Sequence, residues 1–188
     1  MTERIPADPA AEIIVSSEQV YQGHWLKVQQ DHITLPDGSS GVREYVRHPG
    51  AVAVLARLPN GELLLEKQFR SALRRSFIEI PAGKIDPGEA ELDCARRELQ
   101  EETGYQARKW VRLGAADACI GYSDERIVYY FADGLTEGER QLDEGELLEV
   151  FSLPLPTVMA LAQNGDISDS KTIVGLFWLN AYLARLAK

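Results

Sequence analysis

One short segment, residues 83–105, constrains this chain more than any other stretch. Its second half predicts an amphipathic helix, because apolar residues recur there at helical spacing. These residues are Leu92, Ala95 and Leu99. A turn signal at residues 86–88 precedes them, so we expect the helix to begin near Ala90. We expect it to end at Gly104, since glycine commonly terminates helices.

Three glutamates of the predicted helix share one face. Glu98 and Glu102 are four positions apart, and Glu101 lies three positions after Glu98. Like charges at this spacing destabilise a helix by roughly 0.2–0.5 kcal/mol per pair, so the face requires a positive charge. A divalent cation would supply it, and carboxylate ligands suit Mg²⁺ or Mn²⁺. The three acids flank the apolar stripe, where a pocket could be.

Arg97 is the basic residue closest to these acids in the sequence pattern. It lies one turn from Glu101 and could reach back to Glu89 in the preceding loop. Its expected role is therefore to hold carboxylates in position. For the six-residue pattern taken alone, an ordinary exposed helix remains an alternative, with Arg96 and Arg97 forming surface ion pairs with glutamates.

The complete pattern of the segment is G-x5-E-x7-R-E-U-x-E-E-x-G-U, where U is an apolar or aromatic residue. It is matched at Gly83, Glu89, Arg97, Glu98, Leu99, Glu101, Glu102, Gly104 and Tyr105. This resembles the Nudix box at every specified position. The resemblance implies a metal-dependent hydrolase with a Nudix-type α/β/α sandwich and a mixed sheet. It also implies structural support from Gly83, Glu89 and Arg97.

Further blocks resemble the ADP-ribose pyrophosphatase branch of that family over roughly residues 21–150. They read VREYVRHPGAVAVLA, LLLEKQFR, IEIPAGKIDPGE, GYSDE and LDEGE. The resemblance implies Mg²⁺-dependent hydrolysis of the pyrophosphate bond of ADP-ribose to AMP and ribose 5-phosphate, with Mn²⁺ as a second possible ion. The implied metal ligands are Glu98, Glu101, Glu102 and the main-chain carbonyl of Ala82.

A second acidic stretch, between residues 137 and 149, receives a role from the same resemblance. It implies that Glu144 is the base for the attacking water, alongside Glu101 in the catalytic set, and that Glu146 is a further metal ligand. Asp143 and Glu149 are the substitutes if the register of this loop differs. A solvated, flexible loop is the plain alternative.

Substrate phosphates require cationic partners in an acidic protein, and arginine suits bidentate phosphate contact. Arg43 and Arg70 match branch positions that contact substrate, and Ser123 and Glu125 belong to a loop that resembles a substrate-contacting one. Two further arginines are expected to be plain loop charges. These are Arg74 and Arg75.

The rest of the chain predicts a mixed sheet with helices on it, because strands alternate with helices. We expect an N-terminal β region at residues 1–48, with a loose terminus to Glu12 and an antiparallel β-hairpin, and a hydrolase domain at 49–188. Strands are expected at residues 21–35, 42–46, 51–57, 63–69, 127–132 and 148–151, and helices at 156–163 and 171–186. Residues 77–80 form a short apolar run before a loop.

Charge and composition exclude several classes of protein. The net charge of -9 argues against a nucleic-acid binder, because phosphate backbones select for a surplus of lysine and arginine. The two cysteines form no disulfide framework or zinc pattern, which fits a reducing cytoplasm. No secretory signal or long apolar run is present, so we expect no membrane association.

One departure affects the substrate prediction. The branch usually has a proline shortly before the GYSDE-like block, and this chain has Ile120 there. GDP-mannose, NADH and diadenosine polyphosphates therefore remain alternative substrates, and a non-catalytic nucleotide-binding module is a further alternative.

Branch members are typically homodimers, so the resemblance also implies a homodimer in which residues 21–46 reach the partner subunit.

Overall fold

The computed structural model describes residues 9–142, 145 and 147–187 of the chain. They form two compact units. One contains the chain up to His48 together with Cys119–Glu125, and the other contains the segments that begin at Pro49 and at Arg126. In this described part of the chain, no helix has the length and apolar content needed to cross a membrane.

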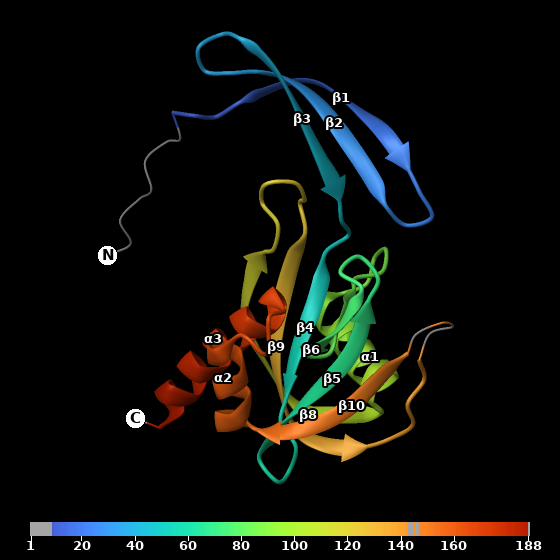
Figure 1. The fold of residues 1–188 in the computed structure, drawn as a ribbon, viewed down its shortest axis with the longest axis vertical. Helices are drawn as coiled ribbons and strands as arrows, with labels where there is room; N and C mark the ends of the chain where they lie inside the picture. Colours follow the sequence, from blue (N-terminus) through green and yellow to red (C-terminus); the bar gives the residue numbers. More distant parts are fainter. Residues whose placement is uncertain (1–8, 143–144, 146, 188) are drawn as a thin grey trace. The chain divides into compact units, whose positions relative to one another are not determined.

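The first unit is built on an antiparallel sheet of three strands in the order β1-β2-β3 (Figure 1). The strands are β1 (Ile13–Gln22), β2 (Lys27–Thr34) and β3 (Ser40–Arg47). The turn between β2 and β3 is favoured locally, because Asp37 Oδ1 accepts hydrogen bonds from Ser39 and Gly38 has a φ of 84°. The expected hairpin is therefore present, and β1 adds a third strand that begins at Ile13, ahead of the predicted strand start at Tyr21.

The second unit contains two sheets. One has four strands in the order β7-β4-β9-β8, and the other has three in the order β10-β5-β6. The strands are β4 (Ala51–Ala56), β5 (Glu62–Arg70), β6 (Arg75–Glu79), β7 (Ala82–Lys84), β8 (Tyr105–Asp117), β9 (Arg126–Glu137) and β10 (Leu148–Pro154). Because β4 runs parallel to β9 and antiparallel to β7, the predicted mixed sheet is confirmed.

Helix α1 (Glu91–Thr103) covers one side of these strands, and helices α2 (Leu155–Asn164) and α3 (Ser170–Leu186) cover the other side (Figure 1). All six residues of β4 are buried, and they alternate between two cores. Leu55 packs in the core that includes α2 and α3, whereas Val54 packs in the core that includes α1. This arrangement confirms the α/β/α sandwich.

The boundaries of the predicted helices agree with the structure to within one residue. Strand β8 is the main omission, because its half-exposed apolar and charged residues do not alternate regularly and so give a weak strand signal. Strand β9 also runs on to Glu137, beyond the predicted end at Ala132. These two long strands pair antiparallel, and β8 is the edge strand of the four-stranded sheet.

Candidate active site

Helix α1 carries the three glutamates of the sequence pattern at its electrostatically less favourable end. Its first turn carries Glu91 and Asp93, which suit the positive end of the helix dipole, and its last turn carries no basic residue. Gly104, with a φ of 78°, ends the helix in the left-handed conformation. The acids of the second half therefore face both mutual repulsion and the negative end of the dipole.

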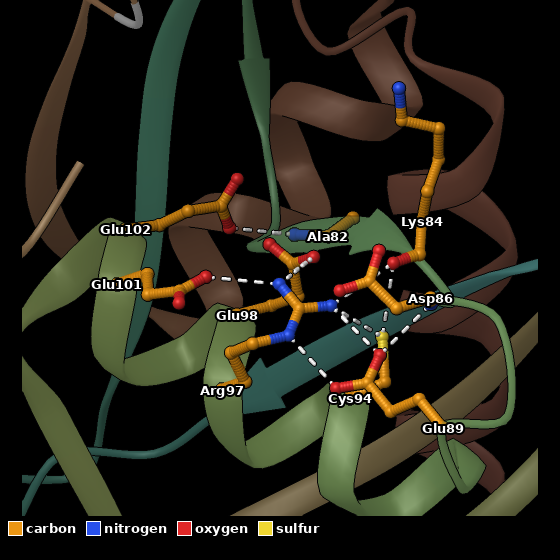
Figure 2. Close-up of polar contacts among 9 residues, drawn as sticks. All are labelled: Ala82, Lys84, Asp86, Glu89, Cys94, Arg97, Glu98, Glu101 and Glu102. Atoms are coloured by element: carbon orange, nitrogen blue, oxygen red, sulfur yellow. Dashed lines mark hydrogen bonds and ion pairs between the residues drawn. The ribbon is translucent and has the colours of Figure 1, made fainter. Parts of the chain in front are cut away.

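Arg97 supplies the positive charge for this cluster (Figure 2). Its Nε and Nη2 donate to the two carboxylate oxygens of Glu89 at 2.8 and 2.9 Å. Its Nη1 donates to Glu98 at 2.7 Å and to Glu101 at 2.9 Å. One guanidinium thus joins two neighbouring helix carboxylates to a third from the preceding loop.

The ionisation of this cluster follows from the same contacts. The hydrogen bonds from Arg97 lower the pKa of Glu89 to about 2, against an opposing effect of burial. The three carboxylates in turn raise the pKa of Arg97, with the hydrogen bonds to Glu89 as the largest cause. The Glu89 carboxylate and the Arg97 guanidinium are therefore both charged at neutral pH.

Gly83 is required by the close approach of Glu98 to the main chain. A Cβ atom at Gly83 would lie 1.9 Å from Cδ of Glu98, far inside any possible contact. The main chain of β7 can therefore pass directly beside the carboxylate only with glycine here. The glycine that begins the sequence pattern, Gly83, is therefore explained by steric exclusion of any larger side chain next to Glu98.

The short loop at residues 80–81 and the start of β7 at Ala82 are fixed from two sides. On one side, the Val54 N–H of β4 donates to the Pro81 carbonyl at 2.8 Å. On the other side, the Ala82 N–H donates to the buried Glu102 carboxylate at 3.0 Å (Figure 2). Arg97 Nη2 adds a bond to the Lys84 carbonyl at 3.1 Å. Main-chain carbonyls of this loop are therefore held next to the helix acids.

These groups form a set of hard oxygen donors, which suits Mg²⁺, Mn²⁺ or Ca²⁺ in chemistry. The predicted ligands Glu98, Glu101 and Glu102 come together with Ala82 at one end of α1 (Figure 2). Within the described residues, however, no three acidic, histidine or cysteine side chains are already arranged to hold an ion. Two of the three acids are instead turned to Arg97.

Arg70 lies at the end of β5, in the same unit. Its Nε and Nη2 donate to the two oxygens of Glu79 at 2.8 and 2.6 Å, and its side chain remains 44% exposed. The hydrogen bonds to Glu79 raise the pKa of Arg70. A partly exposed guanidinium held by a buried carboxylate is suited to receive an anion.

The other predicted substrate residues lie in the first unit. Arg43 and Ser123 both line a hollow of about 260 Å³ there. Arg43 also forms an ion pair with Glu12, and Glu125 lies 3.6 Å from His48 Nε2. The structure thus places Arg43 and Ser123 together, with Glu125 two residues away along the same loop.

Other predicted residues lie outside the described part of the chain or are exposed. Glu144 and Glu146 lie outside the described residues, as does the substitute Asp143, whereas Glu149 is exposed on β10. The two arginines that were expected to be plain loop charges differ from each other. Arg74 is exposed, and Arg75 donates to Ser168 at 2.9 Å and stacks on the ring of Phe77.

Sequence reasoning missed one charged group of the second unit. Glu79 is 3% exposed and is contacted by both Arg70 and Lys171. Lys171 was expected only as the first residue of a helix with core positions. The two partners are 92 positions apart, so no local spacing could indicate the contact.

The chain is similar to known proteins over most of its length. The chain matches the NUDIX domain over residues 46–173 and the nucleoside diphosphate sugar hydrolase N-terminal domain over residues 12–46. It is 38% identical over 167 residues to the ADP-ribose pyrophosphatase of Bacillus subtilis, covering 88% of this chain and 90% of that protein. It is 33% identical over 166 residues to the GDP-mannose pyrophosphatase of Yersinia enterocolitica, covering 80% and 86%.

A solved structure supports the fold. The crystal structure of an ADP compounds hydrolase superimposes with a TM-score of 0.86, covering 96% of this chain and 98% of that one. The two sequences are 23% identical, so this likeness concerns the fold alone.

The ion pair between Glu89 and Arg97 predicts a pH-dependent contribution to stability. The folded pKa of Glu89 is about 2, below its ordinary value of 4.5. The stabilisation is therefore fully present above about pH 4.5 and is lost as the pH falls towards 2. We expect Glu89→Gln to lower the free energy of unfolding by about 1–3 kcal/mol at pH 7. Urea denaturation from pH 7 to pH 3 should show this difference shrinking.

The matched control is Asp93→Asn on the same helix. It removes an exposed ion pair with Arg96, so it should change the free energy of unfolding by less than about 1 kcal/mol. A difference between wild type and Glu89→Gln that stays constant down to pH 3 would contradict the role given to this pair.

Proposed function

The chain belongs to the NUDIX domain family, and from this membership we propose that it hydrolyses the diphosphate linkage of ADP-ribose. The products would be AMP and ribose 5-phosphate. The observation that carries the proposal is the acidic face of α1, which is held against the main chain of Ala82 and Gly83. The similarity to an ADP-ribose pyrophosphatase over 88% of the chain supports the choice of substrate.

The residues fit a divalent cation, and we propose Mg²⁺, with Mn²⁺ as a substitute. Glu98, Glu101, Glu102 and the Ala82 carbonyl would hold it, because all four offer hard oxygen donors in one place. When bound, the ion neutralises charge on the diphosphate and lowers the pKa of a bound water. The close approach of Gly83 to Glu98 keeps the carbonyl side of this set near the acids.

The side chains of the protein have separate tasks in this proposal. Arg97 and Glu89 hold Glu98 and Glu101 in place. Arg70 binds the anionic diphosphate, and Arg43, Ser123 and Glu125 bind other parts of the substrate. These assignments are supported by the exposed guanidinium of Arg70 and by the hollow that Arg43 and Ser123 line.

Hydrolysis itself requires a proton acceptor for the attacking water. Water attacks one phosphorus, the bond from that phosphorus to the bridging oxygen breaks, and the water proton passes to a base. We assign the base to Glu144, with Glu101 in the same catalytic set and Glu146 as a further ligand. The acidic character of this stretch of sequence supports the assignment.

A second substrate has a specific observation in its favour. The similarity to a GDP-mannose pyrophosphatase extends over 80% of the chain. GDP-mannose is also a nucleoside diphosphate sugar, so the same acids and Arg70 would serve its diphosphate. Recognition of the base and of the second sugar would decide between the two compounds.

We also propose that the protein is a homodimer in which residues 21–46 contact the partner subunit. Three large apolar side chains of this segment are exposed: Tyr21, Trp25 and Val42 are 54%, 57% and 45% exposed. Exposed apolar side chains gathered in one segment favour an interface. A cytoplasmic location is supported by the cysteines, since Cys94 and Cys119 are both unpaired.

The proposed activity predicts the outcome of a substrate panel. With Mg²⁺, we expect AMP release from ADP-ribose to exceed nucleoside monophosphate release from GDP-mannose, NADH and diadenosine polyphosphates by tenfold or more in kcat/KM. Glu98→Gln should lower the rate by roughly 100-fold or more, because it removes a charged ligand. Glu91→Gln, in the exposed first turn of the same helix, should retain the rate.

The panel separates the possible errors. A lead by GDP-mannose would move the chain to the second substrate and leave the hydrolase intact. No cleavage of any compound, with or without EDTA, would instead support a module that binds nucleotides without cutting them.

The homodimer predicts a mass in solution. Light scattering should return about twice the chain mass of 20.9 kDa. Val42→Lys in β3 should shift the distribution towards the single chain, because a charge would be buried in the interface. A mass near 20.9 kDa for the wild type would overturn the proposed dimer.

A further inference from the structure

A charged group connects the end of β6 with the first turn of α3. Its centre is the carboxylate of Glu79, whose side chain is 4% exposed. Arg70 donates to both of its oxygens, at 2.8 and 2.6 Å, and Lys171 Nζ donates to one of them. Lys171 also donates to Asp169 at 3.1 Å and is itself only 14% exposed. Two cations therefore share one buried carboxylate.

The same turn of α3 is tied to the adjoining main chain. Asp169 caps the helix by accepting from the Thr172 N–H at 3.0 Å and from the Thr172 hydroxyl at 2.6 Å. The Thr172 hydroxyl in turn accepts from the Ile80 N–H at 3.0 Å. Glu79 and Ile80 are thus both fixed by α3, immediately before Pro81 and the start of β7 at Ala82.

The electrostatic balance of the group depends on Lys171. Burial acts to raise the pKa of Glu79, but the hydrogen bonds from Arg70 and the charge of Lys171 hold it below its ordinary value. The charges of Arg70 and Lys171 balance those of Glu79 and Asp169. Without Lys171 the group would carry a net negative charge directly beside Arg70, and such a charge repels an anionic ligand.

Arg70 keeps donors for a ligand. Its fork to Glu79 uses Nε and Nη2, and within the described residues no protein group accepts a hydrogen bond from Nη1. A planar guanidinium fixed along one edge presents its other edge in a defined direction. Any residue that fixes the Glu79 carboxylate therefore also sets the direction of the free edge of the Arg70 guanidinium.

We propose that Lys171 is a positioning residue for the hydrolysis: by sharing Glu79 with Arg70, it holds the Arg70 guanidinium ready for the diphosphate of the substrate. This inference rests on the proposed function, and it adds a residue of the C-terminal helix to the substrate site. Lys171 acts only through Glu79 and Arg70, and it contacts no reacting atom.

Steady-state kinetics with ADP-ribose and Mg²⁺ test the proposal in wild type, Lys171→Met, Lys171→Arg, Arg70→Met and the double variant. Lys171→Met should raise KM about tenfold and leave kcat within about threefold, because binding of the anion is weakened. Lys171→Arg keeps the charge and should return KM to within about threefold of wild type. In the Arg70→Met background, Lys171→Met should have no further effect on KM.

The matched control is Lys109→Met, which removes an exposed lysine from β8 and should leave KM and kcat unchanged. The proposal is overturned if Lys171→Met keeps the wild-type KM, or if it raises KM equally with and without Arg70. It is also overturned if Lys171→Arg fails to restore KM while its thermal midpoint equals that of wild type. Failure of the proposed function is a different result, in which the wild type itself releases no AMP.

Discussion

Crowding of negative charge on one helix is the constraint on which the rest of this structure depends. Three glutamates lie within five residues at the end of α1 where the helix dipole also opposes them. Arg97 resolves this by binding Glu98 and Glu101 while its other edge is fixed by Glu89. Glu98 and Glu101 are therefore paired with a partly buried arginine of their own helix rather than with solvent-exposed lysines or arginines.

The fold brings main-chain oxygens to these acids from the opposite direction. Strand β7 pairs with the buried β4, so the loop at Ala82 cannot move away from α1. Gly83 allows the closest approach, and Glu102 accepts from the Ala82 N–H. On the far side of the loop, the first turn of α3 fixes Glu79 and Ile80. Both cores of the sandwich thus contribute to the geometry of a single loop.

Much of this site could be predicted from sequence because its members are close together along the chain. Helical periodicity predicted α1 and the shared face of its acids. Arg97 follows Glu89 by only eight positions, so their contact could also be predicted from the sequence. Contacts between distant segments could not be found in this way, as Lys171 and Glu79 show. The same limit applies to β8, whose half-exposed residues follow no clean alternation. The assignments to Glu144 and Glu146 rest on resemblance alone.

The most direct test of the account is a crystal structure with Mn²⁺ and a non-hydrolysable ADP-ribose analogue, with the ion located by its anomalous signal. The account predicts an ion within about 2.0–2.2 Å of carboxylate oxygens from Glu98, Glu101 or Glu102, together with an analogue phosphate in contact with Arg70. An ion bound elsewhere, with Arg97 still holding both Glu98 and Glu101, would contradict it.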